Sequence, residues 1–474
     1  MRKFVIAEEV LIHPFNEPAR ELSVLDPNGK PVPLGLHLND LVESVIGKTS
    51  LEVSLTNENG GIFQLKDELE RPRYGLRPDD EVVVYRDNLY FDREFFVYFL
   101  QKAQASGRPC QAALPADDYA WQRYSIPLTN LRDYKGSDDR GEFYKIDLYY
   151  FPRGWAEPVE WQVVRVPSDA KERGYYNVPD SMSNLKLQEL ESGDSLIRRD
   201  QDLTHFLSWR SCVPIQSWVH IFNANIPLGV FSRGFRFEET AAKSNLLTLK
   251  ILWRSILEQR QFVSCSELVK VGKNCDIDPS AVILGPTTIG DNCKIGAGVV
   301  IDNCVIGDNT TLANNCHLML SVVGANCFLP FRAALFMTTM MDYTIVAQNT
   351  CLQMCVLGRN SFVGAGTTFT DFNLLPSPIK AMDAYGEMSE VGQAVLGGCV
   401  GHNVRVGAGM IVFPGRTIES DVILIASADR RVIGKGITYD MSDHLTLDDR
   451  VAALHSRLYS RRTYMGEEDM LEEW

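Results

Sequence analysis

The chain has 474 residues, of which 45% are apolar and 23% charged, and its formal net charge is −14. This length allows two or three domains with sizeable cores, and the negative charge argues against nucleic acid as a partner, because a phosphate backbone needs a basic face. No apolar run of about 18 residues spans a membrane, and MRKFVIAEEV is too short and too soon acidic for a signal peptide. Its eleven cysteines form no CxxC pair, so we expect a reduced, cytoplasmic protein.

The first half of the chain predicts a mixed α/β domain over residues 1–237. Strand-like runs occur at VVVY (82–85) and KIDLYYF (145–151), and a helix-like segment, EFFVYFLQKAQ, follows Asp92. Residues 238–262 then carry apolar side chains at positions 246, 249, 253 and 256 among good helix formers. A single connecting helix is expected there.

Residues 263–436 repeat a six-residue unit, as in VGKNCD at Val271, IGDNCK at Ile289 and VGAGTT at Val363. Hexapeptide spacing is typical of a parallel β-helix, in which stacked coils bury the aliphatic residue that opens each unit. An ordinary parallel sheet is the poorer alternative, because no helical crossover lies between units. Two stretches out of phase, 336–344 and 371–393, are expected to be loops that leave the wall. Residues 437–474 form a charged tail.

Four segments carry a family resemblance: the hexads of 268–335, LGRNSFVGAGTTFTDFN (357–373), RDNLYFDREFFVYFLQKAQASGRP (86–109) and WVHIFNANI (218–226). Together they resemble the bifunctional bacterial enzymes that join glucosamine-1-phosphate acetyltransferase to N-acetylglucosamine-1-phosphate uridyltransferase and make UDP-N-acetylglucosamine. The resemblance implies an α/β nucleotidyltransferase-like (Rossmann-like) domain, followed by a left-handed parallel β-helix that forms a homotrimer.

In the first domain the resemblance implies a nucleotide site. The family's glycine-rich phosphate loop is missing, since the first glycine is Gly29. Lys30 resembles the lysine that follows that loop, Asp87 is the candidate ligand for Mg²⁺, and Asn225 is the candidate sugar contact. The alternatives are a solvated turn for Lys30 and an Asx turn ahead of a helix for Asp87.

In the β-helix the resemblance implies an acetyltransferase site that uses acyl-CoA as co-substrate. Gln348 stands where the family has its general base, and it cannot titrate. Asp371 and Phe372 replace an asparagine and a tyrosine of the family's pocket. Arg332 and Lys380 are candidate contacts for a sugar phosphate, with a solvated surface charge as the alternative for each.

Two histidines in the hexads, His317 and His402, are alternative candidates for a catalytic base. Either is also explained as a hydrogen-bonded structural residue at a corner of the prism. A β-helical zinc carbonic anhydrase is excluded, because no two histidines have the H-x4-H spacing.

Two hypotheses of different class follow. The chain is a transferase of nucleotide-sugar or amino-sugar metabolism, acting as a nucleotidyltransferase or an acyltransferase. Alternatively, it is a catalytically degenerate trimer that binds a nucleotide sugar or sugar phosphate, or that organises a partner. Fold alone does not decide between them, because function resides in the site.

Overall fold

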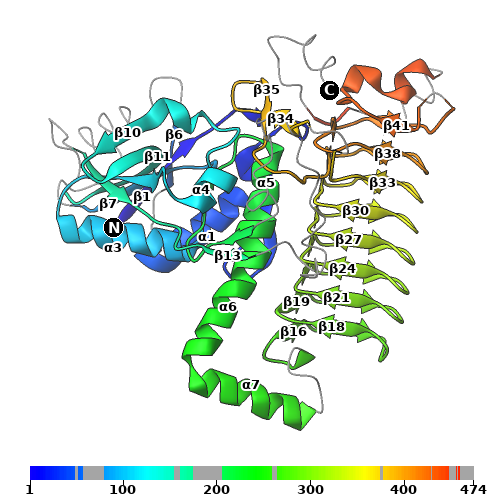
Figure 1. Cartoon of the computed structure of the whole chain (residues 1–474), viewed down its shortest axis with the longest axis horizontal. Helices are drawn as coiled ribbons and strands as arrows, with labels where there is room; N and C mark the ends of the chain where they lie inside the picture. Colours follow the sequence, from blue (N-terminus) through cyan, green and yellow to red (C-terminus); the bar gives the residue numbers. More distant parts are fainter. Residues whose placement is uncertain are drawn as a thin grey trace, which may run out of the picture.

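The computed structural model describes residues 1–48, 80–153, 161–173, 205–258, 264–373, 377–428, 430–447, 455 and 457–459, and the backbone of strand 52–56. Figure 1 shows an α/β domain lying along one side of an upright three-sided prism of short strands. The chain therefore has the predicted fold class, an α/β domain followed by a parallel β-helix.

A mixed sheet forms the centre of the first domain, with strand order β12-β9-β11-β7-β1-β6 and β10 paired to β11. Strand β1 runs parallel to both β6 and β7, whereas β11 is antiparallel to β7. The strands are β1 (Arg2–Ala7), β6 (Glu52–Thr56), β7 (Val82–Arg86), β9 (Cys110–Pro115), β10 (Lys135–Asp138), β11 (Gly141–Phe151) and β12 (Gln162–Arg165). The runs predicted at 82–85 and 145–151 are thus confirmed as β7 and β11.

Short strands and helices surround this sheet. The strands are β2 (Leu11–Ile12), β3 (Glu17–Pro18), β4 (Ser23–Leu25), β5 (Pro31–Pro33), β8 (Leu89–Phe91), β13 (Lys171–Arg173), β14 (His205–Leu207) and β15 (Cys212–Pro214). The helices are η1 (Ala19–Glu21), α1 (Leu34–Ile46), α3 (Arg93–Ser106), α4 (Tyr119–Tyr124), η3 (Asn130–Tyr134), α5 (Trp218–Asn225) and the π-helix η5 (Ile226–Phe231). Helix α3 confirms the predicted helix after Asp92, whose carboxylate caps it by accepting the Phe95 N–H.

The connection to the prism differs from the single helix predicted over 238–262. Helix α6 (Ser232–Lys243) continues from η5, and a separate helix α7 (Asn245–Glu258) turns away from it (Figure 1). The break is at Ser244, which has extended backbone and accepts the Leu247 N–H on its hydroxyl. Because Ser is a good N-cap, it starts a new helix there.

Three parallel sheets of eight strands each form the prism, and we call them walls 1, 2 and 3. Wall 1 contains β16 (Val269–Val271), β19 (Thr287–Ile289), β22 (Val305–Ile306), β25 (Val322–Val323), β28 (Thr339–Met340), β31 (Val356–Leu357), β36 (Cys399–Val400) and β39 (Thr417–Ile418). Wall 2 contains β17 (Asp276–Ile277), β20 (Lys294–Ile295), β23 (Thr311–Leu312), β26 (Phe328–Leu329), β29 (Ile345–Val346), β32 (Phe362–Val363), β37 (Arg405–Val406) and β40 (Ile423–Leu424). Wall 3 contains β18 (Val282–Leu284), β21 (Val300–Asp302), β24 (His317–Met319), β27 (Ala334–Phe336), β30 (Cys351–Gln353), β33 (Thr368–Phe369), β38 (Ile411–Val412) and β41 (Val432–Ile433).

The hexads pack as their pattern predicts. The opening residues Ile289, Ile295 and Val363 are buried inside the prism, and small residues such as Cys293 and Cys327 fill the tighter inward positions. All eleven cysteines carry free thiols.

The glycine in the second place of a hexad is required by the next coil. A Cβ on Gly290 would lie 2.7 Å from the backbone nitrogen of Asp308 one coil on. The left-handed backbone at the corner falls instead on an asparagine two residues later, as at Asn292 with a φ of 57°. Asn is the non-glycine residue that best tolerates this conformation.

One of the two predicted loops is wrong and the other is confirmed. Residues 336–344 continue the wall as β27 and β28, because Met340 fills the inward aliphatic position and Tyr343 adopts the left-handed corner that Asn occupies elsewhere. The stretch after Phe369 does leave the prism as a hairpin, β34 (Lys380–Met382) and β35 (Met388–Glu390). Strand β31 pairs directly with β36 across this insertion.

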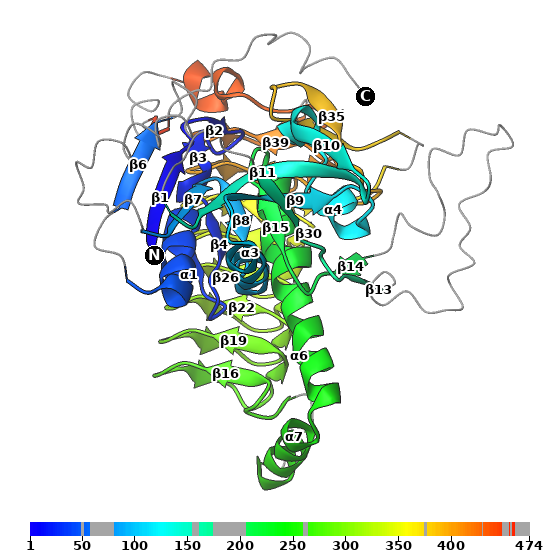
Figure 2. The ribbon, with the colours of Figure 1, turned by 90° about the vertical axis from the view of Figure 1, so that its left-hand side faces the viewer.

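The first domain covers wall 1, and the two share one hydrophobic core. Outward side chains of wall 1, including Val305, Val322 and Val356, belong to the same buried cluster as Trp218 and Phe222 of α5. Figure 2 shows the domain in front of the upper coils, with α6 and α7 below it. Beyond β41, two short helices, η7 (Tyr439–Met441) and η8 (Asp443–Thr446), close the end of the prism, whereas most of the predicted charged tail lies outside the described residues. Among the described residues, no helix has the length and apolar character needed to span a membrane.

Candidate functional site

The carboxyl ends of β1 and β7 meet at one edge of the first domain's sheet, because these two strands are parallel neighbours. Glu8 and Glu9 follow β1, and Asp87 and Asn88 follow β7. In open α/β sheets, ligands bind in the crevice outside the carboxyl ends of the strands. A ligand-binding site is therefore expected at this edge of the sheet.

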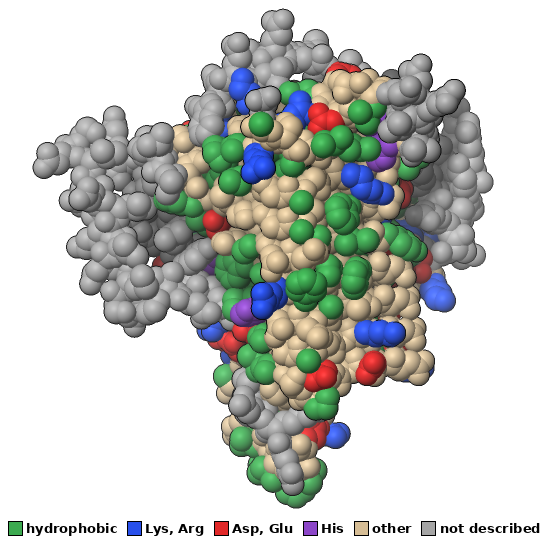
Figure 3. Space-filling view, turned by 90° about the vertical axis from the view of Figure 1, so that its right-hand side faces the viewer, with side chains coloured by type: hydrophobic (Ala, Val, Ile, Leu, Met, Phe, Trp, Pro, Cys, Tyr) green, Lys and Arg blue, Asp and Glu red, His purple; other side chains and the backbone are tan. Residues whose placement is uncertain are grey.

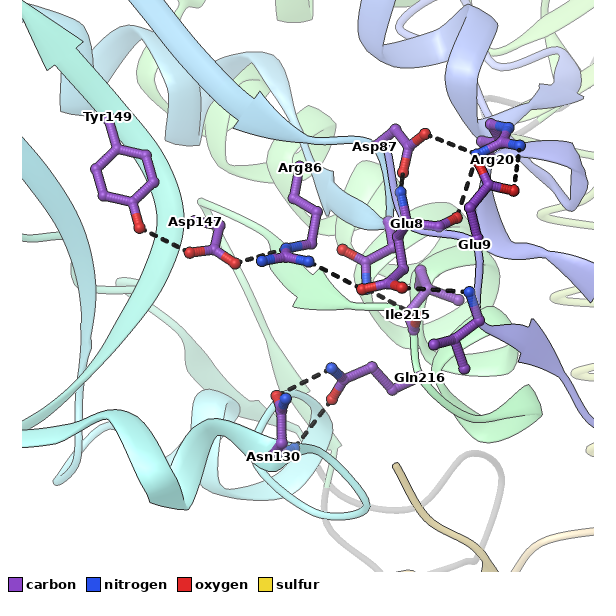
Figure 4. Close-up of polar contacts among 12 residues, drawn as sticks. Glu8, Glu9, Arg20, Arg86, Asp87, Asn130, Asp147, Tyr149, Ile215 and Gln216 are labelled. Carbon is purple, nitrogen blue, oxygen red and sulfur yellow. Dashed lines mark hydrogen bonds and ion pairs between the residues drawn. The ribbon is translucent and has the colours of Figure 1, made fainter. Parts of the chain in front are cut away.

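Arg86, the last residue of β7, joins three strands at this edge (Figure 4). Its Nε donates to Asp147 of β11 at 2.6 Å, and its Nη1 donates to Glu8 at 2.9 Å. Tyr149 donates its hydroxyl to the same Asp147 at 2.7 Å. Burial opposes the charge of Arg86, but the carboxylates of Asp147 and Glu8 outweigh it and raise the pKa of the guanidinium.

Asp87 is enclosed by hydrogen-bond donors. One carboxylate oxygen accepts the Glu8 N–H at 2.8 Å, and the other accepts Nη1 of Arg20 at 3.2 Å. Arg20 also donates to Glu9. Burial raises the pKa of Asp87 to about 6, although these two donors oppose the rise. The side-chain partner of Asp87 is therefore Arg20 of η1. The Asx turn predicted for Asp87 ahead of a helix is not observed, because Asp92 caps that helix.

Two cavities flank these strand ends. The Arg86 cavity, of about 150 Å³, is lined by Glu8, Arg86, Asn88, Leu89, Asn130, Leu131, Tyr134, Lys145, Ile146, Asp147, Pro214 and Gln216. The Arg20 cavity, of about 540 Å³, is lined by Val5, Ala7, Glu9, Arg20, Gly35, Leu38, Tyr85 and Asp87. The first is mostly polar, and the second has an apolar floor beside a cation.

Lys145 is the distinctive charge of the Arg86 cavity. It is half-buried, and no carboxylate of the described residues pairs with it. By contrast, Arg86 is held by two carboxylates. On another side of the cavity, Gln216 and Asn130 hold each other through two hydrogen bonds, at 2.9 and 3.0 Å (Figure 4). A cation, carboxylates and carboxamides thus meet in one cavity.

The residues around Asp87 do not fit the Mg²⁺ site that the family resemblance implies. Both carboxylate oxygens already accept hydrogen bonds, and the side chain is only 8% exposed. Within the described ranges, no group of three or more Asp, Glu, His or Cys side chains is arranged to hold a metal. Mg²⁺ needs open oxygen ligands, which Arg20 occupies here.

Lys30 and Asn225 do not line either cavity. Lys30 lies in the β4–β5 turn, and its ammonium is 3.9 Å from Asp308 on the prism. Asn225 is buried at the end of α5 and donates to the Ser23 carbonyl at 2.9 Å. In this arrangement Lys30 contacts the prism and Asn225 holds α5 to β4, and their roles toward a sugar nucleotide stay predictions.

On the prism, Arg332 and Gln348 lie in neighbouring coils at the edge between walls 2 and 3. Arg332 is exposed in the left-handed corner position, and Gln348 is half-buried. His317 is exposed on wall 3, where it pairs with Ala334 of the next coil. The edge therefore combines a cation and an amide with an imidazole nearby.

The segment that carries Asp371 and Lys380 binds the first domain. Asp371 begins the insertion, and burial raises the pKa of its carboxyl. Lys380 opens β34. Further along the hairpin, Ala384 donates its N–H to the Leu128 carbonyl and Gln393 donates to Asn223. The insertion that the family resemblance assigns to an acyl acceptor site is thus a contact between the two halves of the molecule.

His402 is fully buried where the β2–β3 hairpin meets the prism. Its Nδ1 accepts the Arg359 N–H at 2.8 Å, as the carboxylates of Asp291 and Asp342 accept N–H groups of preceding coils on the same edge. Phe15 lies against its ring with centroids 5.0 Å apart. Burial, and the nearby guanidinium of Arg359, lower the pKa of His402 although Glu17 opposes this. With no exposed surface, the ring serves a structural contact here, and its role as a base stays a prediction.

Comparison with a family model finds a likeness in the first coils of the prism. A family model described as the GMPPB C-terminal domain matches residues 265–334. The bifunctional protein GlmU of Synechococcus elongatus is 28% identical over 178 residues, which are 34% of this chain and 38% of that protein. GlmU of Ruthia magnifica subsp. Calyptogena magnifica is 25% identical over 193 residues, 38% of this chain and 37% of that protein.

The chain resembles the GlmU family. It spans less than two fifths of the length of these curated relatives. Among solved structures, the acetyltransferase domain of PglB from Neisseria gonorrhoeae in complex with acetyl coenzyme A is 16% identical, covering 35% of this chain and 60% of that chain with a TM-score of 0.15. That score is too low to support an argument about the site.

Sequence reasoning missed most of the residues that the fold brings together here. Glu8, Arg20 and Arg86 come from three separate segments of the first domain, and Lys145 and Asp147 come from a fourth, strand β11. One signal was present: the strand KIDLYYF alternates Lys145, Asp147 and Tyr149 with apolar residues, and polar side chains on one face of a central strand point to a lined cavity.

Proposed function

We propose that the chain is a transferase-type protein of nucleotide-sugar or amino-sugar metabolism whose first domain binds a sugar phosphate in the Arg86 cavity. The observation that carries the proposal is Lys145, a half-buried cation without a carboxylate partner among the described residues, in a polar cavity at the carboxyl ends of parallel strands.

The lining chemistry suits such a ligand. Lys145 offers a point charge to a phosphate, as lysines commonly do in phosphate sites. Asp147 offers hydrogen-bond acceptors to sugar hydroxyls, and Asn88 offers both a donor and an acceptor. Asn130 fixes the orientation of the Gln216 carboxamide by accepting a hydrogen bond from it. The Arg20 cavity beside it has an apolar floor of Val5, Ala7 and Leu38 that suits a nucleoside, with Arg20 near the phosphates.

In nucleotidyl transfer, a phosphate oxygen of a sugar 1-phosphate attacks the α-phosphorus of a nucleoside triphosphate, and pyrophosphate leaves. Here Lys145 and Arg20 would orient the two anionic reactants from the two cavities, which would hold the attacking oxygen near its target. Positioning and positive charge are the main contributions a protein makes to phosphoryl chemistry.

The finer expectations remain part of this proposal. UDP-N-acetylglucosamine is the expected nucleotide sugar, a cytoplasmic homotrimer the expected form, and acyl-CoA an expected co-substrate of the prism. The Mg²⁺ that the resemblance implies is not part of this proposal, because Arg20 occupies the carboxylate of Asp87. For acyl transfer, Gln348 and Arg332 would face the acceptor, without a titrating base at Gln348.

A second candidate function, ligand binding without turnover, is favoured by one specific observation. The segment between β1 and α1, where the family resemblance implies the phosphate loop, forms the β2–β3 hairpin and docks on the prism. Asn16 donates to Glu419 at 2.8 Å, and His13 lies 2.9 Å from Thr417. A segment held in this way is not free to wrap a triphosphate.

Thermal shift tests the binding proposal. Glucosamine-1-phosphate, N-acetylglucosamine-1-phosphate and UDP-N-acetylglucosamine should each be screened against the free sugars and inorganic phosphate. A ligand at 100 times its Kd adds about 2.7 kcal/mol of stability. We expect phosphorylated sugars to raise the Tm, and Lys145→Met to abolish the rise while Lys273→Met, an exposed lysine on the prism, preserves it.

Two results would contradict the proposal: no stabilisation by any phosphorylated sugar, or equal stabilisation of wild type and Lys145→Met. Phosphorus NMR of wild type with UTP and a bound sugar 1-phosphate then separates the two functions. Pyrophosphate formation supports the transferase, and its absence supports the binding protein.

A further inference from the structure

The insertion in the prism reaches the first domain through the tip of the β34–β35 hairpin. On the side away from the first domain the coils form a continuous surface (Figure 3), whereas the hairpin lies between the prism and the first domain (Figure 1). At the tip, Ala384 donates its N–H to the Leu128 carbonyl at 3.0 Å, and Tyr385 donates its hydroxyl to Asp133. Leu128 precedes η3, and Asp133 lies within it. The tip therefore holds η3 at two points.

Elsewhere the hairpin leaves space beside η3. A cavity of about 570 Å³ lies between η3 and the hairpin and is lined by residues of both. After β35 the insertion contacts other elements: Arg123 of α4 donates to the Gly392 carbonyl, and Gln393 donates to Asn223 of α5 at 3.3 Å. The tip is therefore the part of the hairpin that can fix η3.

Asp383 gives the tip its shape. One of its carboxylate oxygens accepts the N–H groups of Tyr385 at 2.9 Å and Glu387 at 3.0 Å, and the other accepts the Ser389 hydroxyl at 2.6 Å. The side chain is buried. An aspartate that accepts N–H groups of the residues that follow it fixes a turn. Asp383 therefore orients Ala384 and Tyr385 toward the first domain.

Helix η3 connects this contact to the Arg86 cavity, because its Asn130, Leu131 and Tyr134 line that cavity. Asn130 donates its N–H to the Gln216 carboxamide oxygen at 3.0 Å, and its own side-chain oxygen accepts the Gln216 amide at 2.9 Å. A displacement of η3 would therefore move the Gln216 carboxamide or break both of these hydrogen bonds.

The backbone between the tip and Asn130 is strained. Leu128 has a φ of 64°, in the left-handed region that residues other than glycine rarely adopt. Such a conformation persists only where the surrounding contacts impose it. Here they come from two sides: His220 lies 2.8 Å from the Pro127 carbonyl oxygen, and Ala384 binds the Leu128 carbonyl. Loss of the hairpin contact would let Leu128 relax and displace Asn130.

We propose that the β34–β35 hairpin of the prism positions the Gln216 carboxamide in the Arg86 cavity and thereby sets the affinity for a sugar phosphate, with Asp383 as the positioning residue. The tip fixes η3, and η3 fixes Gln216. This inference rests on the proposed binding of a sugar phosphate in that cavity. Because coupling between two sites is reciprocal, a sugar phosphate bound to Gln216 also strengthens the hairpin contact. The prism and the first domain then form one binding unit.

Two variants of the full chain test the inference, and the first measurement needs no ligand. Asp383→Ala removes the acceptors that shape the tip, whereas Asp383→Asn keeps an oxygen for the two N–H groups and an amide for the Ser389 hydroxyl. Hydrogen exchange of residues 128–134, read by mass spectrometry, includes the Asn130 N–H that binds Gln216. We expect exchange on the order of tenfold faster in Asp383→Ala, the factor that corresponds to losing about one hydrogen bond, and wild-type exchange in Asp383→Asn. Exchange in α3 should be unchanged in both variants.

Calorimetry with glucosamine-1-phosphate is the second measurement. We expect the Kd to rise on the order of tenfold in Asp383→Ala and to stay at the wild-type value in Asp383→Asn. Wild-type exchange at 128–134 in Asp383→Ala overturns the inference, and so does faster exchange with an unchanged Kd. If the wild type binds no phosphorylated sugar, the proposed function fails, and the exchange result alone decides whether the hairpin positions Gln216. Should Asp383→Ala not fold, Tyr385→Phe, which loses the hydroxyl that binds Asp133, takes its place in both measurements.

Discussion

His220 makes the stability of the first domain sensitive to acid. Its Nδ1 accepts the N–H groups of Gln216 and Ser217, both at 3.0 Å, and its Nε2 lies 2.8 Å from the Pro127 carbonyl oxygen. The ring is thus neutral, with its proton on Nε2. Burial lowers the pKa of His220 to about 4, although the hydrogen bond to Pro127 opposes the shift.

The direction of the pH effect on stability follows from proton binding in the folded and the unfolded state. In the unfolded chain, His220 titrates near the ordinary value of about 6.5, so the unfolded state binds the proton first as the pH falls. The contribution of His220 is therefore fully present above about pH 6.5 and is lost progressively toward pH 4. At about 1.4 kcal/mol per pH unit, the loss reaches about 2 kcal/mol at pH 5.

The variant His220→Asn tests this. Its carboxamide oxygen can accept the same two N–H groups, but it does not titrate and loses the bond to Pro127. At pH 7.5 we expect it to be less stable than wild type by about 1–3 kcal/mol, the usual result of losing a buried hydrogen bond. By pH 5 that deficit should shrink by about 2 kcal/mol in urea unfolding followed by circular dichroism.

The control is Ser125→Ala, which removes a buried hydroxyl that donates to the Cys212 carbonyl at 2.6 Å and does not titrate, so its loss of stability should be the same at pH 7.5 and pH 5. A deficit of His220→Asn that is equal at pH 7.5 and pH 5 would refute the reasoning, because it would mean that His220 binds its proton equally in both states. Since His220 positions Gln216, acid should also weaken ligand binding in the Arg86 cavity.

Three further predictions follow from the other contacts. Arg20→Ala should create a Mn²⁺ site at Asp87 and Glu9 that calorimetry detects, because the guanidinium no longer occupies these carboxylates. Wild type should bind no Mn²⁺ there, and the double variant Arg20→Ala/Asp87→Asn should lose the binding. Equal binding by wild type and Arg20→Ala would show that the guanidinium does not block the site. Acetyl transfer from acetyl-CoA to glucosamine-1-phosphate should be absent or slower than in the resembled family by a factor on the order of 10² to 10⁴, because Gln348 cannot act as a base, and a normal enzymatic rate would move the base to His317 or His402. Gly290→Ala should lower the free energy of unfolding by about 1–3 kcal/mol, because the new Cβ would overlap the Asp308 backbone. Gly366→Ala, which has open space around it, should cost only the strain of a positive φ. Equal losses of stability in denaturant unfolding would show that the coils can move apart.

The sequence was most informative where the determinants are local. Each hexad specifies its own inward residue, so Ile289 and Val363 could be placed without knowledge of the rest of the chain. The error at 336–344 has the same origin: Met340 fills an aliphatic position, and a pattern restricted to Ile, Leu and Val does not recognise it. A broader apolar class would have extended the repeat.

The site depends on long-range contacts that the pattern does not contain. Arg20 reaches Asp87 across 67 positions of the chain, and Arg86 reaches Asp147 across 61. Asp87 was predicted as a Mg²⁺ ligand from the resemblance; the structure places it at the strand ends, where its partner Arg20 was not predictable without the sheet order. His402 is a similar case, since the motif places it at a corner and only the fold covers it with Phe15.

The first domain contacts the prism at two different heights, and these two contacts fix the number of coils between them. The β4–β5 turn touches a lower coil through Lys30 and Asp308, and the β2–β3 hairpin touches a higher one through Asn16 and Glu419. Repeat proteins usually accept the gain or loss of a whole repeat, because each repeat contacts only its neighbours. Here the distance between the two contacts is set by the first domain, so deleting one coil between Asp308 and Glu419 would prevent one of the two contacts from forming.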